Sequence, residues 1–230
     1  MNRPDGATPA PLRIKSYTLG PYATNCYLLW IEGGTDAWIV DASFGPGRIV
    51  KDLNELGLKP SRLLLTHAHV DHIAGVEEVL RALRPAGAAA PALLIHRGEE
   101  SWLSDPVLNL SALGGMAVTT RSPDEFIAEG DTLTLGGGEQ SVAFNVLHTP
   151  GHSPGGVSLY APSHGVVLSG DALFAGSIGR TDFPGGDLRT LERSIRDKLY
   201  TLPRETTVLS GHGPQTTVGE EMDTNEFVRA

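Results

Sequence analysis

The sequence predicts an α/β protein made of two halves, each a β-sheet with helices, that pack sheet against sheet. Three observations lead to this prediction. Apolar runs of strand length, separated by glycine and proline, occur along the whole chain. Segments with apolar residues at every third or fourth position lie among them in both halves. With 230 residues, 40% of them hydrophobic, the chain can also bury the several layers that such a fold requires.

The first half begins with strands and then alternates helices with strands. Helical spacing runs through residues 47–56, and a second helix leaves a histidine-rich loop at Ile73. The short apolar run directly before this loop is typical of a buried strand. The strands expected in this half are residues 12–19, 25–31, 37–40, 62–65 and 93–96.

The second half, beyond Gly130, consists mainly of short strands between glycine- and proline-bearing turns. One helix is expected at residues 188–199, where apolar residues recur at helical spacing. Residues 104–124 show no period, and we expect a loop that covers the functional site. The strands expected in this half are residues 132–135, 142–147, 157–160, 166–169 and 207–209.

Composition narrows the class of protein. A formal net charge of −9 without any basic run argues against nucleic-acid binding, and the apolar runs are too short to cross a membrane. The single cysteine, Cys26, excludes an internal disulfide, which favours a reducing cytoplasm. Residues 1–11 lack the pattern of a secretory signal, and we expect a disordered tail followed by one domain over residues 12–230. The oligomeric state is not indicated by the sequence.

Potential metal ligands are most concentrated in the segment Thr66-His67-Ala68-His69-Val70-Asp71-His72, which follows a predicted buried strand. It places three imidazoles and one carboxylate within six residues, and zinc and iron prefer these groups as ligands. Four potential ligands exceed the three that a mononuclear catalytic site takes from the protein. The segment therefore predicts a site for two metals.

Three further potential ligands follow the ends of predicted strands in the second half. Each stands directly after a glycine, as Gly151-His152, Gly170-Asp171 and Gly211-His212. Glycine lets the backbone turn tightly and approach a metal closely. If these strand ends meet the histidine-rich segment at one rim, they assemble seven ligands: His67, His69, Asp71, His72, His152, Asp171 and His212.

This pattern resembles the metallo-β-lactamase superfamily, whose signature has the form T-H-x-H-x-D-H, and the resemblance extends from about residue 12 to residue 227. Within that superfamily the chain is similar to the glyoxalase II-like hydrolases of the short, single-domain type. The segments that carry this similarity are residues 20–27, 170–182, 211–214 and 219–221. The resemblance implies an αβ/βα four-layer sandwich, in which two mixed sheets pack face to face with helices outside.

The resemblance also implies a role for each ligand. One divalent metal would be held by His67, His69 and His152, a second by Asp71, His72 and His212, and both by a bridging Asp171. Zinc is the expected metal, with iron or manganese as alternatives, because all three accept nitrogen and oxygen ligands. A bridging hydroxide, oriented by Asp71 as a catalytic residue, would then hydrolyse a small-molecule thioester such as S-lactoylglutathione.

Two residues outside the ligand set have open interpretations. Asp41, after a predicted strand, either accepts a hydrogen bond from the metal-binding loop or caps a turn. Arg180 either binds an anionic group of the substrate or forms a salt bridge with Asp182 or Asp187.

Other functions are compatible with the same residues. Persulfide dioxygenases have a similar short architecture with one iron, and their Gly-Arg-Thr-Asp-Phe segment resembles residues 179–183. Lactonases and other hydrolases of this fold, and a non-catalytic metal-binding module, are further alternatives. Full-length glyoxalase II enzymes carry a C-terminal helical domain that contributes to the glutathione site. Because 18 residues follow His212 here, we expect recognition of glutathione to differ.

Overall fold

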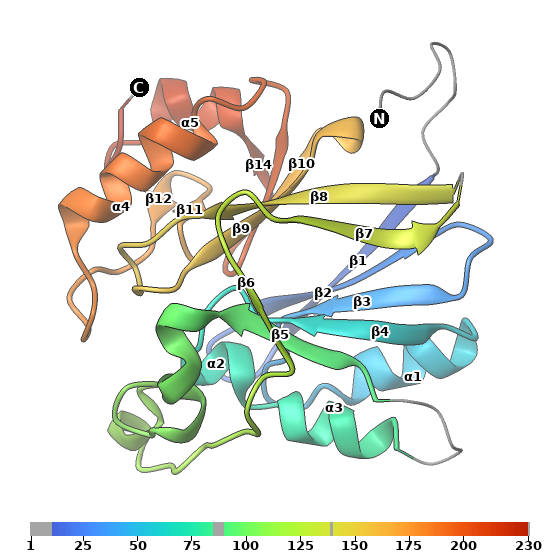
Figure 1. The fold of residues 1–230 in the computed structure, drawn as a ribbon. Helices are drawn as coiled ribbons and strands as arrows, with labels where there is room; N and C mark the ends of the chain where they lie inside the picture. Colours follow the sequence, from blue (N-terminus) through green and yellow to red (C-terminus); the bar gives the residue numbers. More distant parts are fainter. Residues whose placement is uncertain (1–10, 85–89, 139, 230) are drawn as a thin grey trace.

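Two six-stranded mixed sheets face each other, and helices cover the outer side of each, as the sequence predicts (Figure 1). The computed structural model describes residues 11–229 except 85–89 and 139, so the predicted tail lies outside the described residues apart from Pro11. Within these described residues, no helix is long and apolar enough to cross a membrane.

The first sheet has the strand order β1-β2-β3-β4-β5-β6. β1 to β3 pair antiparallel because short turns join them, whereas β3 to β6 run parallel because longer connections return the chain to the same end. The elements of this half are β1 (Leu12–Leu19), β2 (Thr24–Ile31), β3 (Asp36–Val40), α1 (Gly47–Glu55), β4 (Lys59–Leu64), α2 (Val70–Ile73), α3 (Val76–Ala82), β5 (Ala92–His96), the 3₁₀ helices η1 (Arg97–Ser104) and η2 (Ser111–Gly114), and β6 (Glu125–Ile127).

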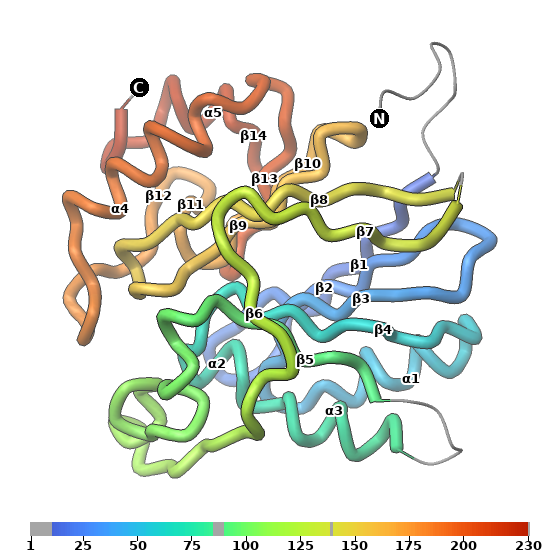
Figure 2. Tube along the Cα trace, viewed as in Figure 1, coloured from blue at the N-terminus to red at the C-terminus, as the bar shows by residue number. Residues whose placement is uncertain are grey.

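The second sheet has the order β14-β13-β10-β9-β8-β7, and β10 and β13 are its one parallel pair among the described residues. Figure 2 shows the chain passing from the first half to the second between β6 and β7. The elements are β7 (Thr132–Gly137), β8 (Gln140–His148), β9 (Val157–Ala161), η3 (Pro162–His164), β10 (Val166–Gly170), β11 (Leu173–Phe174), β12 (Ser177–Ile178), α4 (Leu188–Ser194), the π-helical η4 (Ile195–Leu199), β13 (Thr207–Ser210), β14 (Thr216–Thr217) and α5 (Val218–Thr224).

Three apolar layers hold the sandwich together, one between the sheets and one beneath the helices on each outer face. In β2, Leu28 packs toward the helices and Leu29 toward the opposite sheet, so this strand is buried on both faces. Trp38 of β3 and Phe144 of β8 meet across the sheet interface with ring centroids 5.3 Å apart. The docking of the two sheets therefore depends on the central layer.

The strand ends that carry the predicted ligands lie at one edge of this sandwich. Hydrogen bonds join the two halves there: Val157 N–H donates to the Thr66 carbonyl (2.9 Å), and Asn25 N–H donates to the Gly211 carbonyl (2.7 Å). Because both bonds lie next to ligand-bearing turns, they fix the separation of the turns from the two halves.

Replacing Phe144 with alanine should lower the free energy of unfolding by about 3–5 kcal/mol, because it leaves a cavity between the sheets beside Trp38. Urea denaturation followed by tryptophan fluorescence measures the change. Phe227→Ala is the control, since that ring is 57% exposed, and it should cost under about 0.5 kcal/mol. Equal losses in the two variants would contradict a central role for the layer between the sheets.

Candidate metal centre

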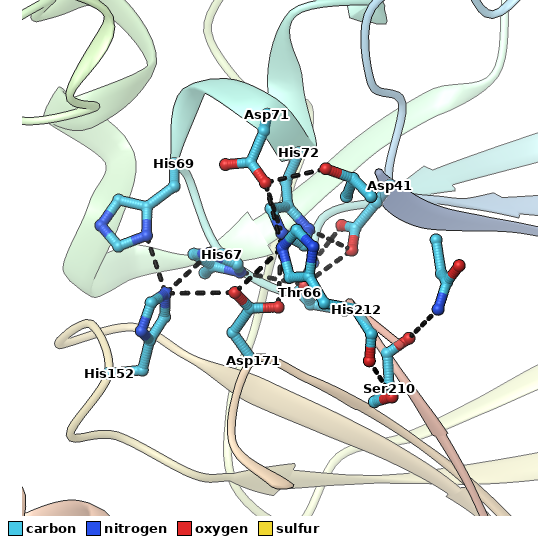
Figure 3. Close-up of polar contacts among 12 residues, drawn as sticks. Asp41, Thr66, His67, His69, Asp71, His72, His152, Asp171, Ser210 and His212 are labelled. Atoms are coloured by element: carbon cyan, nitrogen blue, oxygen red, sulfur yellow. Dashed lines mark hydrogen bonds and ion pairs between the residues drawn. The ribbon is translucent and has the colours of Figure 1, made fainter. Parts of the chain in front are cut away.

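The histidine-rich segment is a tight turn that leads from β4 into the short helix α2. His69 precedes the first residue of the helix, and Asp71 and His72 lie in its first turn. This places the four side chains at the edge of the first sheet, facing the ends of strands from the second sheet (Figure 3). His67, His69 and His72 are all at most 3% exposed.

The first group of converging atoms consists of three imidazole nitrogens. His69 Nδ1 lies 2.8 Å from His152 Nε2, which lies 3.2 Å from His67 Nε2. His152 donates its Nδ1 proton to the Arg180 carbonyl (2.7 Å), so its Nε2 presents a lone pair to the other two rings. Three lone pairs that converge at such distances match the edges of a tetrahedral metal site.

The second group combines one carboxylate with two imidazoles. Asp71 Oδ2 lies 3.4 Å from His72 Nε2 and 3.2 Å from His212 Nε2. The other nitrogen of each ring is held by an oxygen: His72 Nδ1 by Asp41 at 2.8 Å, and His212 Nδ1 by the Tyr22 carbonyl at 3.1 Å. As for His152 in the first group, these partners fix the ring orientation and leave Nε2 available to a metal.

Asp171 stands between the two groups. Its Oδ2 lies 3.5 Å from His152 Nε2 and 3.4 Å from His212 Nε2, and its Oδ1 lies 3.4 Å from His72 Nε2. Asp171 Oδ1 and His72 Nε2 are both buried without a hydrogen-bond partner. Unpaired buried polar atoms are costly, and a bound cation would satisfy both, so the site fits a pair of metals.

Two glycines make room for this carboxylate. A Cβ on Gly211 would lie 2.0 Å from Asp171 Oδ1, and a Cβ on Gly179 would lie 1.9 Å from the Asp171 carbonyl oxygen. Any side chain at either position would displace Asp171. Glycine before His212 is thus required by close packing against Asp171.

The close packing of carboxylates and imidazoles shifts the pKa values of several side chains in the site. Burial alone would raise the pKa of Asp171, but His72 and His212 outweigh it and hold this pKa well below its usual value. Burial would lower the pKa of His72, yet Asp71, Asp171 and Asp41 raise it well above normal. Burial would also lower the pKa of His212, but hydrogen bonds to Asp171 and Asp71 raise this pKa to about 9. Because metals bind neutral imidazole, metal binding at these residues would release protons.

Asp41 takes the hydrogen-bonding role that the sequence left open. It is buried and accepts hydrogen bonds from the backbone N–H and hydroxyl of Thr66, both 2.8 Å long, in addition to its contact with His72. Its φ of +59° is uncommon for a residue with a side chain. Such backbone strain persists where surrounding contacts fix it, and here those contacts hold the start of the metal-binding turn.

A second positioning carboxylate, Glu99 in η1, was not predicted. It is fully buried and accepts from Ala68 N–H (2.5 Å), between His67 and His69, and from Gly155 N–H (2.7 Å), three residues after His152. Burial raises its pKa. Glu99 therefore links the turn that bears His67 and His69 to the turn that bears His152. The local sequence does not indicate which glutamate is buried, because the neighbouring Glu100 has the same side chain and is exposed.

Arg180 makes the salt bridge that was one of its two predicted interpretations. Its Nε and Nη2 donate to the two carboxylate oxygens of Asp182 at 2.9 and 2.7 Å, and its guanidinium lies 4.2 Å from the Phe183 ring centroid. It nevertheless lines the cavity above the ligands. Binding of a substrate anion by Arg180 stays a prediction.

A cavity of about 410 Å³ opens over the ligand atoms. Its floor includes His69, Asp71, His152, Asp171 and His212. Leu110, Leu113 and Gly114 also line it, so the aperiodic segment 104–124 does border the site as expected. All seven predicted ligands thus come together, in groups whose ligand atoms lie within 4.8 Å of one another, and five of the seven line the cavity.

Comparison with known proteins places the chain in a family of metal-dependent proteins. The sequence profile of the Metallo-beta-lactamase superfamily matches residues 19–212. A probable metallo-hydrolase, YqgX of Bacillus subtilis (strain 168), is 43% identical over 94% of this chain and 98% of its own length. Hydroxyacylglutathione hydrolase GloC of Haemophilus influenzae (strain ATCC 51907 / DSM 11121 / KW20 / Rd) is 34% identical over 95% of this chain and 99% of its own.

Two solved structures resemble the whole chain. The BLEG-1 B3 metallo-beta-lactamase is 41% identical, with a TM-score of 0.86 over 95% of this chain and all of its own. TTHA1623, in a di-iron-bound form, is 36% identical, with a TM-score of 0.77 over 93% of this chain and all of its own. Both likenesses span the two halves that supply the ligands.

Replacing Asp171 with asparagine should lower metal content from about two ions per chain to one or none, because the amide removes the negative charge between the two groups. Elemental analysis after equilibration with zinc or iron measures the content, and circular dichroism checks the fold. Asp182→Asn is a control with the same charge change, 11 residues further along the chain and beyond β12. Full metal content in Asp171→Asn would refute the bridging position.

Replacing Glu99 with glutamine should weaken the first metal about 10–100-fold, because an amide cannot accept from both Ala68 and Gly155. Competition with a chelator measures the affinity of each metal in turn. The neighbouring variant Glu100→Gln is the control, since that side chain is half exposed and makes an ion pair with Arg97. Equal metal affinities in the two variants would show that Glu99 only supports the fold.

Proposed function

This chain belongs to the metallo-β-lactamase superfamily, and from that membership and the site geometry we propose that it is a binuclear metal-dependent hydrolase of a small-molecule thioester of the S-lactoylglutathione type. The observation that carries the proposal is the shared carboxylate: Asp171 faces both the His67, His69 and His152 group and the Asp71, His72 and His212 group. Two divalent ions held there would polarise the substrate carbonyl and lower the pKa of a water molecule to roughly 7.

Zinc and iron both suit the ligands. The donors are imidazole nitrogens and carboxylate oxygens, which either metal accepts, and the related TTHA1623 was crystallised in a di-iron-bound form. We therefore propose two divalent ions, with zinc and iron as the candidates and manganese as an alternative.

The residues of the cavity support hydrolysis by water. Among the described residues that line it there is no serine or cysteine to act as a nucleophile. Cys26 is buried away from the cavity, and burial, with Asp41 nearby, raises the pKa of its thiol to about 12. This lining supports a direct attack by water on the acyl carbon, with a thiolate as the leaving group.

Asp71 is the catalytic residue in this proposal. Its Oδ2 accepts a hydrogen bond from Thr24 at 2.8 Å, and the carboxylate faces the cavity. Its pKa is about 2, because His72 and His212 outweigh the effect of burial. An ionised carboxylate at this place orients water by accepting its hydrogen bond. The relationship to GloC supports a thioester, and the lone cysteine supports a cytoplasmic setting.

Metal analysis combined with two assays tests the proposal. We expect about two metal ions per chain, hydrolysis of S-lactoylglutathione that is lost on chelation and restored by zinc or iron, and no oxygen uptake with glutathione persulfide. Asp171→Asn is the inactive control. One iron per chain with oxygen consumption would favour the dioxygenase. Opening of lactones or β-lactams without thioesterase activity would instead assign another hydrolysis to the same site.

A further inference from the structure

The cavity over the ligands has two chemically different surfaces. Its floor is made of ligand side chains, but its walls are apolar: Val70, Tyr22, Leu110, Leu113, Phe174 and Phe183. Leu113 is 73% exposed and Tyr22 is 49% exposed, so large apolar side chains remain open at the mouth. Exposed apolar surface beside a reactive centre is typical of a ligand-binding site.

The wall that carries Leu110 and Leu113 is a fixed structure. The fully buried side chain of Asn109 donates to the carbonyls of Trp102 and Val118 and accepts from Ser111 N–H. The Asn109 carbonyl also accepts from Val70 N–H at 2.8 Å, which joins this wall to the metal-binding helix α2. The apolar side chains are therefore held in place relative to the ligands.

Backbone conformation at Leu110 supports the same conclusion. Leu110 has a φ of +68°, in the left-handed region that branched side chains rarely adopt. Strain of this kind persists at sites where the surrounding structure enforces it, commonly where a ligand binds. Leu110 lines the cavity, so the strained residue belongs to its wall.

Apart from the candidate metal ligands, the cavity offers little charge to a substrate. Among the described residues lining it, Arg180 is the only lysine or arginine, and Asp182 already neutralises its guanidinium through two hydrogen bonds. A substrate carboxylate that bound to Arg180 would have to displace Asp182. The recognition surface beyond the reacting atoms is thus mainly apolar.

We propose that the apolar walls bind an uncharged aliphatic or aromatic acyl group of the substrate, and that Leu113 determines specificity for it. This inference rests on the proposed function and names its substrate class. Water adds to the acyl carbon, the carbon–sulfur bond breaks, and the products are a carboxylic acid and a thiol. The acyl group lies against Leu110, Leu113 and Phe183, while the carbonyl faces the floor.

A series of thioesters with one uncharged leaving group, N-acetylcysteamine, tests the substrate class. The acyl groups are acetyl, butyryl, hexanoyl and phenylacetyl, and S-lactoylglutathione is the anionic comparison. We expect kcat/KM to rise about fourfold for each added methylene until the cavity is full. We also expect hexanoyl and phenylacetyl thioesters to exceed S-lactoylglutathione.

Leu113→Ser should reduce kcat/KM for the hexanoyl thioester roughly tenfold more than for the acetyl thioester, through a higher KM. Val107→Ser is the matched control, since Val107 lies in the same segment, is 66% exposed and does not line the cavity.

Asp182→Asn should raise kcat/KM for S-lactoylglutathione selectively, because it frees Arg180.

A binding measurement separates the two proposals. We expect the thioether S-hexyl-N-acetylcysteamine, which cannot be hydrolysed, to bind the wild-type protein more tightly than its S-methyl analogue, and this difference to shrink in Leu113→Ser. Thioester hydrolysis with no dependence on acyl length, or with equal effects of the Leu113 and Val107 variants, would overturn the inference and leave the proposed function standing. Chain-length-dependent binding without turnover of any thioester would overturn the proposed function while upholding the apolar acyl site.

Discussion

The carboxylate of Asp171 is the point on which the arrangement of the site depends, because its two oxygens face ligand groups on opposite sides. It must be ionised and buried at once, which is unfavourable unless positive charge surrounds it. Without metals, protonated His72 and His212 provide that charge, and bound metals would replace them as its source. Gly211 lies close against this carboxylate, and Gly179 lies close against the backbone carbonyl of Asp171.

The position of the Asp171 carboxylate relative to the histidines depends on how the two halves of the chain pack together. Asp41 fixes the start of the metal-binding turn from within the first half, through Thr66 and His72. Glu99 fixes the distance between this turn and the one that bears His152. The two buried carboxylates therefore perform different tasks, one orienting a ring and the other spacing two loops. Neither touches the cavity, which leaves the walls free to determine the substrate.

Sequence reasoning succeeded where the signal is local. The layered α/β architecture followed from apolar periodicity, and the ligand turns followed from strand ends that carry glycine before a polar residue. The strands β6, β11, β12 and β14 were not predicted, because two or three residues give too short a pattern, and the seven-residue helix α5 was also missed. The predicted helix 188–199 is confirmed in position but changes from α to π geometry at Ile195. Glu99 was not predictable, since its partners are 31 and 56 residues away along the chain.

The division of ligands between the halves also has a consequence for biosynthesis. Four candidate ligands precede the passage from β6 to β7 and three follow it, and each of the two groups includes a residue from either side. A growing polypeptide that has exposed only its first half thus holds an incomplete set for either ion. Complete coordination must await synthesis of the last strands, after which each ion would clamp distant parts of the chain and narrow the unfolded ensemble. The candidate set for the first ion would be complete once His152 is made, and the set for the second once His212 is made.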